Sequence, residues 1–248
     1  MKQIDLLAFG PHPDDVELFC GGTVAKTATQ GHTTAVIDLT EGELASRGTV
    51  SERQVEAEAA SKILGLATRE NLKLPDGGVN PHDEHQVQEV VGILRKLTPK
   101  IVLLPYHVER HPDHEAASQL IKRSIFFAGL SNFKSQLGPR YIPSQVFYYQ
   151  MRYEFSPSFI VDTSNVIEKK LAAIQAYSSQ IKVDQSQART LVSSELNVSS
   201  IMARDEYIGA KIGVKFGEAF LSERVLSITD PVSHFGAHRT DNALFFER

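Results

Sequence analysis

The sequence contains a single cysteine, Cys20, among 248 residues. One thiol cannot form a disulfide within the chain, so a disulfide-stapled secreted fold is excluded and a reducing compartment is favoured. The chain also lacks an excess of positive charge, since its net charge is −4 and its pI is near 6.1. We therefore expect neither nucleic acid nor an anionic membrane surface as a partner.

Long apolar runs are missing as well. No stretch approaches the roughly 18 consecutive apolar residues of a membrane-spanning helix, and the first residues lead into a short apolar segment without a basic and apolar leader. These features favour a soluble, cytoplasmic protein. Repeats and low-complexity segments are also absent, and the length fits one large domain. We predict a single domain over residues 1–248, with residues 229–248 as an interface tail.

The sequence does show alternating strand and helix patterns. Short apolar or β-branched segments predict strands at residues 4–9, 33–39, 71–74, 101–104, 146–149 and 159–161. Apolar positions at helical spacing predict helices at residues 16–30, 51–64, 85–97, 113–127, 165–177 and 200–213, with Ser51 capping the second. This alternation is typical of βαβ units. It predicts an α/β fold in which a Rossmann-like, mostly parallel sheet is flanked by helices.

Clusters of histidine and aspartate follow two of the predicted strands. Residues 10–15 read Gly-Pro-His-Pro-Asp-Asp, and residues 110–114 read Arg-His-Pro-Asp-His. Because the carboxyl ends of parallel strands lie at one edge of a sheet, the two clusters are expected to converge there. Imidazole and carboxylate groups suit a catalytic zinc, which takes three protein ligands and leaves one coordination position open.

The two adjacent aspartates are expected to do different work. In the first turn of a helix, neighbouring side chains point about 100° apart. One of Asp14 and Asp15 can therefore bind a metal beside His12, while the other accepts a proton from water. His111 or His114 can supply the third ligand. Each cluster alone is also compatible with a simple helix start, because aspartate and proline favour such positions, but the occurrence of both favours a metal site.

The two clusters and their spacing resemble those of the PIG-L/LmbE-like zinc-dependent N-acetylglucosaminyl deacetylases. Further segments are similar to the branch that deacetylates N-acetylglucosaminyl malate in bacillithiol biosynthesis. They are Thr-Glu-Gly-Glu at 40–43, Ser-Glu-Arg-Gln-Val-Glu-Ala at 51–57, Leu-Pro-Asp-Gly at 74–77 and Ile-Gly-Val-Lys-Phe-Gly-Glu-Ala-Phe at 212–220. The resemblance covers nearly the whole chain. It implies an LmbE-like fold, conversion of N-acetylglucosaminyl L-malate to glucosaminyl L-malate, and a homo-oligomer, with hexamers among the assemblies of the family.

The resemblance also implies roles for individual residues. Asp14 is the general base. His111 stabilises the oxyanion or serves as the acid, and Asp113 orients it. The implied ligands of Zn²⁺, one ion per chain, are His12, Asp15 and His114.

Three residues are candidates for binding the amino-sugar substrate: Arg53, Arg110 and Glu41. A guanidinium forms paired hydrogen bonds with carboxylates, and the malyl group carries two of them. The alternative for Arg53 is a solvent-facing pair with Glu52 or Glu56.

Other functions remain open at this point. A nucleotide-binding oxidoreductase would suit the fold class, but two carboxylates in the first turn would repel a pyrophosphate. A metal-dependent phosphoesterase is a second alternative, although such sites often gather more carboxylates around two metals. A metal-binding module without catalysis is a third, and it would have no use for a spare base. Within the deacetylases, another N-acetylglucosamine-type sugar or conjugate is the alternative substrate.

Overall fold

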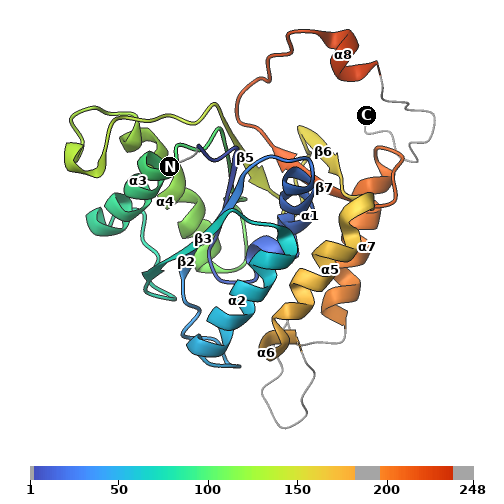
Figure 1. The fold of residues 1–248 in the computed structure, drawn as a ribbon, viewed down its shortest axis with the longest axis horizontal. Coiled ribbons are helices and arrows are strands. Elements are labelled where there is room, and N and C mark those ends of the chain that lie inside the picture. Colours follow the sequence, from blue (N-terminus) through green and yellow to red (C-terminus); the bar gives the residue numbers. More distant parts are fainter. Residues whose placement is uncertain (1–2, 182–195, 237–248) are drawn as a thin grey trace.

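A computed structural model describes residues 3–181 and 196–236 of the chain (Figure 1). The strands are β1 (Leu6–Gly10), β2 (Thr34–Thr40), β3 (Thr68–Leu74), β4 (Ile101–Pro105), β5 (Gln145–Tyr149), β6 (Phe159–Asp162) and β7 (Gly217–Leu221). The helices are α1 (Asp15–Thr29), α2 (Val50–Leu64), α3 (Glu84–Leu97), α4 (Pro112–Ala128), α5 (Ile167–Ala176), α6 (Ser178–Ile181), α7 (Leu196–Ala210) and α8 (Pro231–Phe235). Short 3₁₀ turns lie at Ser135–Leu137 and Ser164–Val166.

In the described part of the chain the strands form one seven-stranded sheet in the order β3-β2-β1-β4-β5-β7-β6. The first five strands in this order are parallel, and β7 runs antiparallel to both of its neighbours. Figure 1 shows α3 and α4 on one side of the sheet and α1, α2, α5 and α7 on the other. The predicted α/β fold with a mostly parallel, helix-flanked sheet is confirmed.

Each face of the sheet has its own hydrophobic core. Along β1, Leu6 and Ala8 pack in the core that includes α1, α2 and α5, while Leu7 and Phe9 pack in the core under α3 and α4. A strand covered on both faces needs apolar residues at successive positions, which is why β1 reads as a continuous apolar run. The order of strands places β1 beside β4, with Leu6 opposite Ile101.

Two local predictions need correction. Thr49, not Ser51, caps α2: its hydroxyl accepts the Glu52 N–H, and the Glu52 carboxylate accepts the Thr49 N–H in a capping box. Strand β7 was not predicted. It carries the buried carboxylate of Glu218 in its interior, and this residue removes the apolar signal that a short strand needs.

The segment that leads to α8 stands away from the sheet in Figure 1, and Val225, Val232 and Phe235 are exposed there. Residues 237–248 of the predicted interface tail lie outside the described residues, so its role stays a prediction. No helix within the described ranges is long and apolar enough to cross a membrane.

Candidate metal centre and active site

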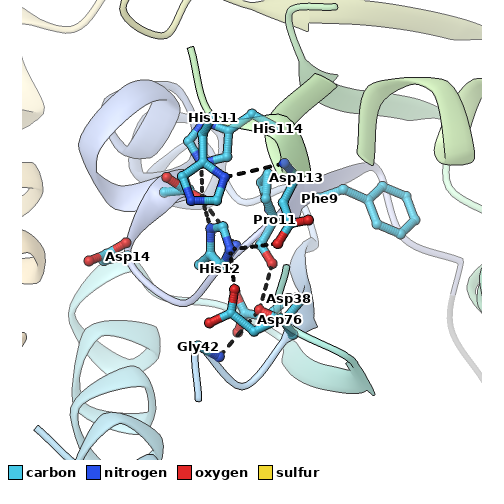
Figure 2. A network of polar contacts seen from close by, with 12 residues as sticks. Phe9, Pro11, His12, Asp14, Asp38, Gly42, Asp76, His111, Asp113 and His114 are labelled. Atoms are coloured by element: carbon cyan, nitrogen blue, oxygen red, sulfur yellow. Dashed lines mark hydrogen bonds and ion pairs between the residues drawn. The ribbon is translucent and has the colours of Figure 1, made fainter. Parts of the chain in front are cut away.

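The two clusters of histidine and aspartate meet at the carboxyl edge of the sheet. The turn after β1 carries His12, and the start of α4, directly beyond β4, carries His111 and His114. The ring centroid of His12 lies 4.9 Å from that of His111 and 5.4 Å from that of His114 (Figure 2). The expected convergence follows from the pairing of β1 with β4.

Three side chains from these turns present potential metal ligands to one another. The donor atoms of His12, Asp15 and His114 all lie within 4.8 Å of each other, and all three residues are buried. Asp15 Oδ2 is 3.2 Å from His12 Nδ1 and 3.3 Å from His114 Nε2. Two nitrogens and one carboxylate oxygen are the donors of a catalytic zinc site that keeps an open position.

Three further observations fit a cation at this point. His114 Nδ1 is buried and has no hydrogen-bond partner among the described residues. Burial acts to lower the pKa of His12, but contacts with three carboxylates, Asp113, Asp15 and Asp76, raise it well above its usual value. Burial likewise opposes ionisation of Asp15, yet His114 and His12 hold the pKa of its carboxyl well below the ordinary range. The site therefore concentrates negative charge that a cation would neutralise.

His12, His111 and Asp113 form a second group of possible ligands within 4.8 Å. It is the weaker candidate, because Asp113 Oδ2 already accepts the Gly77 N–H at 2.6 Å and faces His12 Nε2 at 3.4 Å. Such contacts are typical of the carboxylates that orient a metal-binding histidine through its other nitrogen.

Asp14 lies just before α1 rather than in its first turn, which corrects the expected placement. Its φ is 108°, in the left-handed region that non-glycine residues rarely adopt. This backbone, and not the rotation between helical neighbours, separates the two carboxylates. Figure 2 shows the Asp14 side chain apart from the contacts that His12 makes with Asp76 and Asp113. Strained backbone of this kind is often kept at functional sites.

The Asp14 carboxylate is buried beside a guanidinium. Burial raises its pKa to about 7, with the neighbouring charge of Asp15 acting in the same direction and Arg53 acting against it. Arg53 Nη2 lies 3.4 Å from Asp14 Oδ2. A carboxyl group whose pKa is near neutrality is suited to accept and return a proton.

Arg53 is buried, so it is not the solvent-facing residue of the alternative prediction. Glu52 caps α2, and Glu56 accepts hydrogen bonds from Ser178 and Ser179 instead. Arg53 Nη1 also donates to the Gly42 carbonyl at 3.4 Å.

The loop after β2 accommodates this guanidinium only because position 42 is glycine. Gly42 has a φ of +69°, and a Cβ there would lie 1.7 Å from Arg53 Nη1. A side chain at this position would therefore force Arg53 away from Asp14.

His111 and Asp113 do not make the expected contact through their side chains. His111 caps α4, and its Nδ1 accepts the backbone N–H of Asp113 at 3.2 Å. The Asp113 carboxylate instead faces His12 and Gly77. Burial, together with His114 and His12, lowers the pKa of His111, so the neutral ring is favoured, with its proton on Nε2.

Glu41 also differs from expectation. Its carboxylate pairs with Lys73 at 3.1 Å and lines a separate groove beside α2 and β3. The unpredicted acid is Asp76, which follows β3 and faces His12 Nε2 at 3.2 Å. That contact lowers the pKa of Asp76 to about 2. Asp76 could have been predicted from the sequence, because it follows a third parallel strand that ends at the same edge of the sheet.

These groups open into a cavity of about 610 Å³. Leu18, Phe19 and Leu44 give it apolar walls, and Arg110 and Arg152 stand at its exposed rim. The remaining lining residues are His12, Asp14, Asp15, Ala45, Ser46, Arg53, Asp76, Gly77, Glu109, His111, His114 and Gln180.

Glu109 organises the rim. Its carboxylate is buried and accepts the backbone N–H of Arg110 at 2.6 Å and that of Arg152 at 2.7 Å. Arg110 was a predicted substrate-binding residue, and the structure places it on this cavity. Arg152 was missed, although it follows β5 at the same edge of the sheet.

Comparison with known proteins adds independent findings. The family model described as PIG-L: GlcNAc-PI de-N-acetylase matches residues 7–125. A diacetylchitobiose deacetylase of Thermococcus kodakarensis is 33% identical over 194 residues, which cover 72% of this chain and 71% of that protein. The crystal structure of a conserved protein of Thermus thermophilus superposes with a TM-score of 0.82 at 38% identity, covering 91% of this chain and 98% of the other. The structure of an N,N′-diacetylchitobiose deacetylase of Pyrococcus horikoshii superposes with a TM-score of 0.76 at 26% identity, covering 87% of this chain and 82% of the other.

Proposed function

Because the chain belongs to the PIG-L family of de-N-acetylases, we propose that it hydrolyses the N-acetyl group of an N-acetylglucosamine-type substrate in a zinc-dependent reaction. One observation carries the proposal. The donor atoms of His12, Asp15 and His114 converge in a cavity of about 610 Å³ that is also lined by Asp14, whose buried carboxyl group has a pKa of about 7.

His12, Asp15 and His114 would hold the ion. Zinc supplies Lewis-acid chemistry at such a site, since it lowers the pKa of water from ~15.7 to ~7 and polarises an acetamide carbonyl. Asp76 and Asp113 orient the His12 ring through Nε2, which leaves Nδ1 on the side of Asp15.

Asp14 acts as the base. It accepts a proton from the attacking water as the new bond forms to the acetyl carbon, and it returns the proton to the nitrogen as the carbon–nitrogen bond breaks. Acetate and the free amine are the products. Its pKa of about 7 suits both halves of this cycle.

His111 stabilises the developing negative charge. Because Nδ1 accepts the Asp113 N–H, the neutral ring carries its proton on Nε2 and donates it to the oxygen of the former carbonyl. A preorganised donor of this kind is worth about 3 kcal/mol.

For the natural substrate we propose N-acetylglucosaminyl L-malate, as in bacillithiol biosynthesis. Arg110 and Arg152 at the rim form no ion pair with a described residue, and they suit the two carboxylates of the malyl group. The alternative is an uncharged N-acetylglucosamine oligomer, which the names of two relatives favour. The branch assignment also rests on the sequences of residues 40–43, 51–57, 74–77 and 212–220.

The test is to load the purified protein with zinc, supply N-acetylglucosaminyl malate, N,N′-diacetylchitobiose or N-acetylglucosamine, and detect free amine. Release from the malyl substrate with the highest kcat/KM supports the full proposal. Preference for diacetylchitobiose supports deacetylation but rejects the malyl substrate. No release from any of the three rejects the proposed function.

A further inference from the structure

Helix α1 is interrupted one turn after the metal-binding aspartate. Cys20 has φ −140° and ψ 15°, which are not helical values. The break separates a short segment with Asp15, Leu18 and Phe19 from the longer remainder of the helix. Leu18 and Phe19 are the apolar wall of the cavity, so the placement of this short segment fixes both a candidate ligand and a surface that a substrate would touch.

A break in a helix leaves backbone groups without their intrahelical partners. Here two side chains from distant elements satisfy them. On the C-terminal side, the Glu218 carboxylate of β7 accepts the N–H of Gly22 at 2.9 Å and that of Thr23 at 2.7 Å. On the N-terminal side, Arg204 Nη2 of α7 donates to the Leu18 carbonyl at 3.1 Å.

The two caps are joined by a buried chain of charges. Lys170 Nζ lies 2.6 Å from Glu218 Oε1 and 2.6 Å from Asp205 Oδ2, and Asp205 accepts from Arg204 at 2.7 Å and 3.0 Å. The side chains of Lys170, Asp205 and Glu218 are essentially inaccessible to solvent. Buried charges are tolerated when they are paired and hydrogen-bonded, and removing one partner is costly. The network therefore holds the break in a single arrangement.

Arg204 extends from this network to the cavity wall. Its guanidinium carbon lies 5.2 Å from the centroid of the Phe19 ring, and Nη1 donates to the carbonyls of Gln150 and Met151 at 3.4 Å and 3.3 Å. The chain continues from Met151 directly to Arg152 at the rim. The Arg204 guanidinium thus connects the Leu18–Phe19 wall with the end of β5, where the guanidinium carbon of Arg152 also lies 5.8 Å from the Phe19 ring centroid. Arg204 itself does not line the cavity.

We propose that Arg204 is a positioning residue that fixes the Leu18–Phe19 wall relative to Arg152 and so sets the shape of the substrate side of the cavity. The inference rests on the proposed function in one respect, which is the identity of the substrate that binds in this cavity. It also gives a role to the segment at 212–220, whose Glu218 caps the other half of α1 through the same network.

The informative variant is Arg204→Lys. It keeps the positive charge near Asp205 but replaces the planar guanidinium by an ammonium group, which cannot donate the same set of hydrogen bonds. The matched control is Arg123→Gln. The guanidinium carbon of Arg123 lies at the same 5.2 Å from the centroid of an aromatic ring, that of Phe127, and Arg123 is exposed and does not line the cavity. Both variants are compared with the zinc-loaded wild type, with N,N′-diacetylchitobiose and N-acetylglucosaminyl malate as probes.

For Arg204→Lys we expect KM to rise about tenfold with kcat within about twofold, because a displaced wall weakens substrate and transition-state binding alike. Zinc content should stay at the wild-type value. Hydrogen exchange should accelerate at the amides of residues 15–19 and 150–152, but not in the second half of α1. Arg123→Gln should match the wild type in all of these measurements.

Unchanged KM and unchanged local exchange in Arg204→Lys would overturn the proposal. So would a variant that no longer folds or that exchanges faster throughout, because either result would make Arg204 a determinant of global stability alone. The exchange measurement needs no turnover. If the wild type releases no amine, the proposed function fails, and the exchange pattern still decides whether Arg204 positions the wall.

Discussion

Asp14 and Asp15 are neighbours in the sequence, yet the pKa values of their carboxyl groups are shifted in opposite directions. Burial and the neighbouring charge of Asp15 raise the pKa of Asp14 to about 7 against the effect of Arg53, whereas the contacts of Asp15 with His114 and His12 keep its pKa well below the usual range. Two acids with separated pKa values can divide the work of a site between them. Here Asp15 is the ionised candidate ligand and Asp14 is the candidate base.

Asp14→Asn is expected to keep zinc but lose activity. The amide has nearly the same shape as the carboxyl group but cannot accept the proton of water, and general-base catalysis is typically worth about 10²–10⁴ in rate. The measurements are kcat/KM for amine release and zinc content by elemental analysis. Near-wild-type turnover in a zinc-loaded Asp14→Asn protein would remove Asp14 from the mechanism.

His114→Ala is expected to lower zinc content well below one ion per chain. The variant loses one of three donors, and its zinc-dependent rise in Tm should shrink with its affinity, since a ligand at about a thousand times Kd adds about 4 kcal/mol to the stability of the folded state. His85→Ala is the control, because His85 is an exposed residue of α3 that pairs with Glu89 on its own helix. Equal zinc binding by the two variants would contradict the proposed ligand set.

Arg110→Ala should raise KM for N-acetylglucosaminyl malate and leave KM for uncharged diacetylchitobiose nearly unchanged. The reason is that a charged hydrogen bond to a carboxylate contributes about 1.5–3 kcal/mol, and only the malyl substrate offers one. Arg152→Ala should behave in the same way. Equal losses on both substrates would show that the rim arginines do not recognise carboxylates.

Gly42→Ala should reduce activity more than its backbone strain explains. Alanine in the left-handed region costs about 1–2 kcal/mol, and here its Cβ would also displace Arg53 from the Asp14 carboxylate. Gly31→Ala provides the comparison, because Gly31 has a φ of +87° with nothing within 4 Å of the added Cβ. We expect both variants to lose similar stability in urea unfolding and only Gly42→Ala to lose kcat/KM. An equal loss of activity in both would argue against a role for the Arg53 contact.

Glu218→Gln should destabilise the protein by about 3–5 kcal/mol, because it leaves the buried Lys170 with one anionic partner fewer. The amide also offers only one oxygen to the N–H groups of Gly22 and Thr23. Glu70→Gln, which breaks the more exposed pair with Lys96, should cost less than about 1 kcal/mol. If the two variants had similar midpoints of urea unfolding, the buried network would add little to the stability of the protein.

The sequence predicted the alternation of strands and helices and the two turns that carry the site. Residues 10–15 and 110–114 stand out because each follows a strand that is apolar at successive positions. Local patterns of this kind depend on near neighbours, so they are readable without the fold. The approach of His12 to His114 then followed from a single rule about parallel strands.

The features that were missed depend on contacts between distant segments. Asp76 meets His12 across 64 positions, and Glu218 caps Gly22 across 196. The predicted partner of Asp113 was wrong for a related reason. The expected contact was with the nearby His111, whereas the Asp113 carboxylate faces His12 in another loop. The left-handed backbone of Asp14 has no local signal, because aspartate at a helix start normally adopts extended backbone.

The pairing of β1 with β4 has a consequence for the order of events in folding. His12 and Asp113 are 101 positions apart in the chain, so their meeting must await closure of a long loop, whose entropic cost is recovered only when the central strands dock. An unfolded or nascent chain therefore offers a metal ion scattered imidazoles rather than a chelating pocket. We therefore expect the ion to bind only after the central strands of the sheet have assembled.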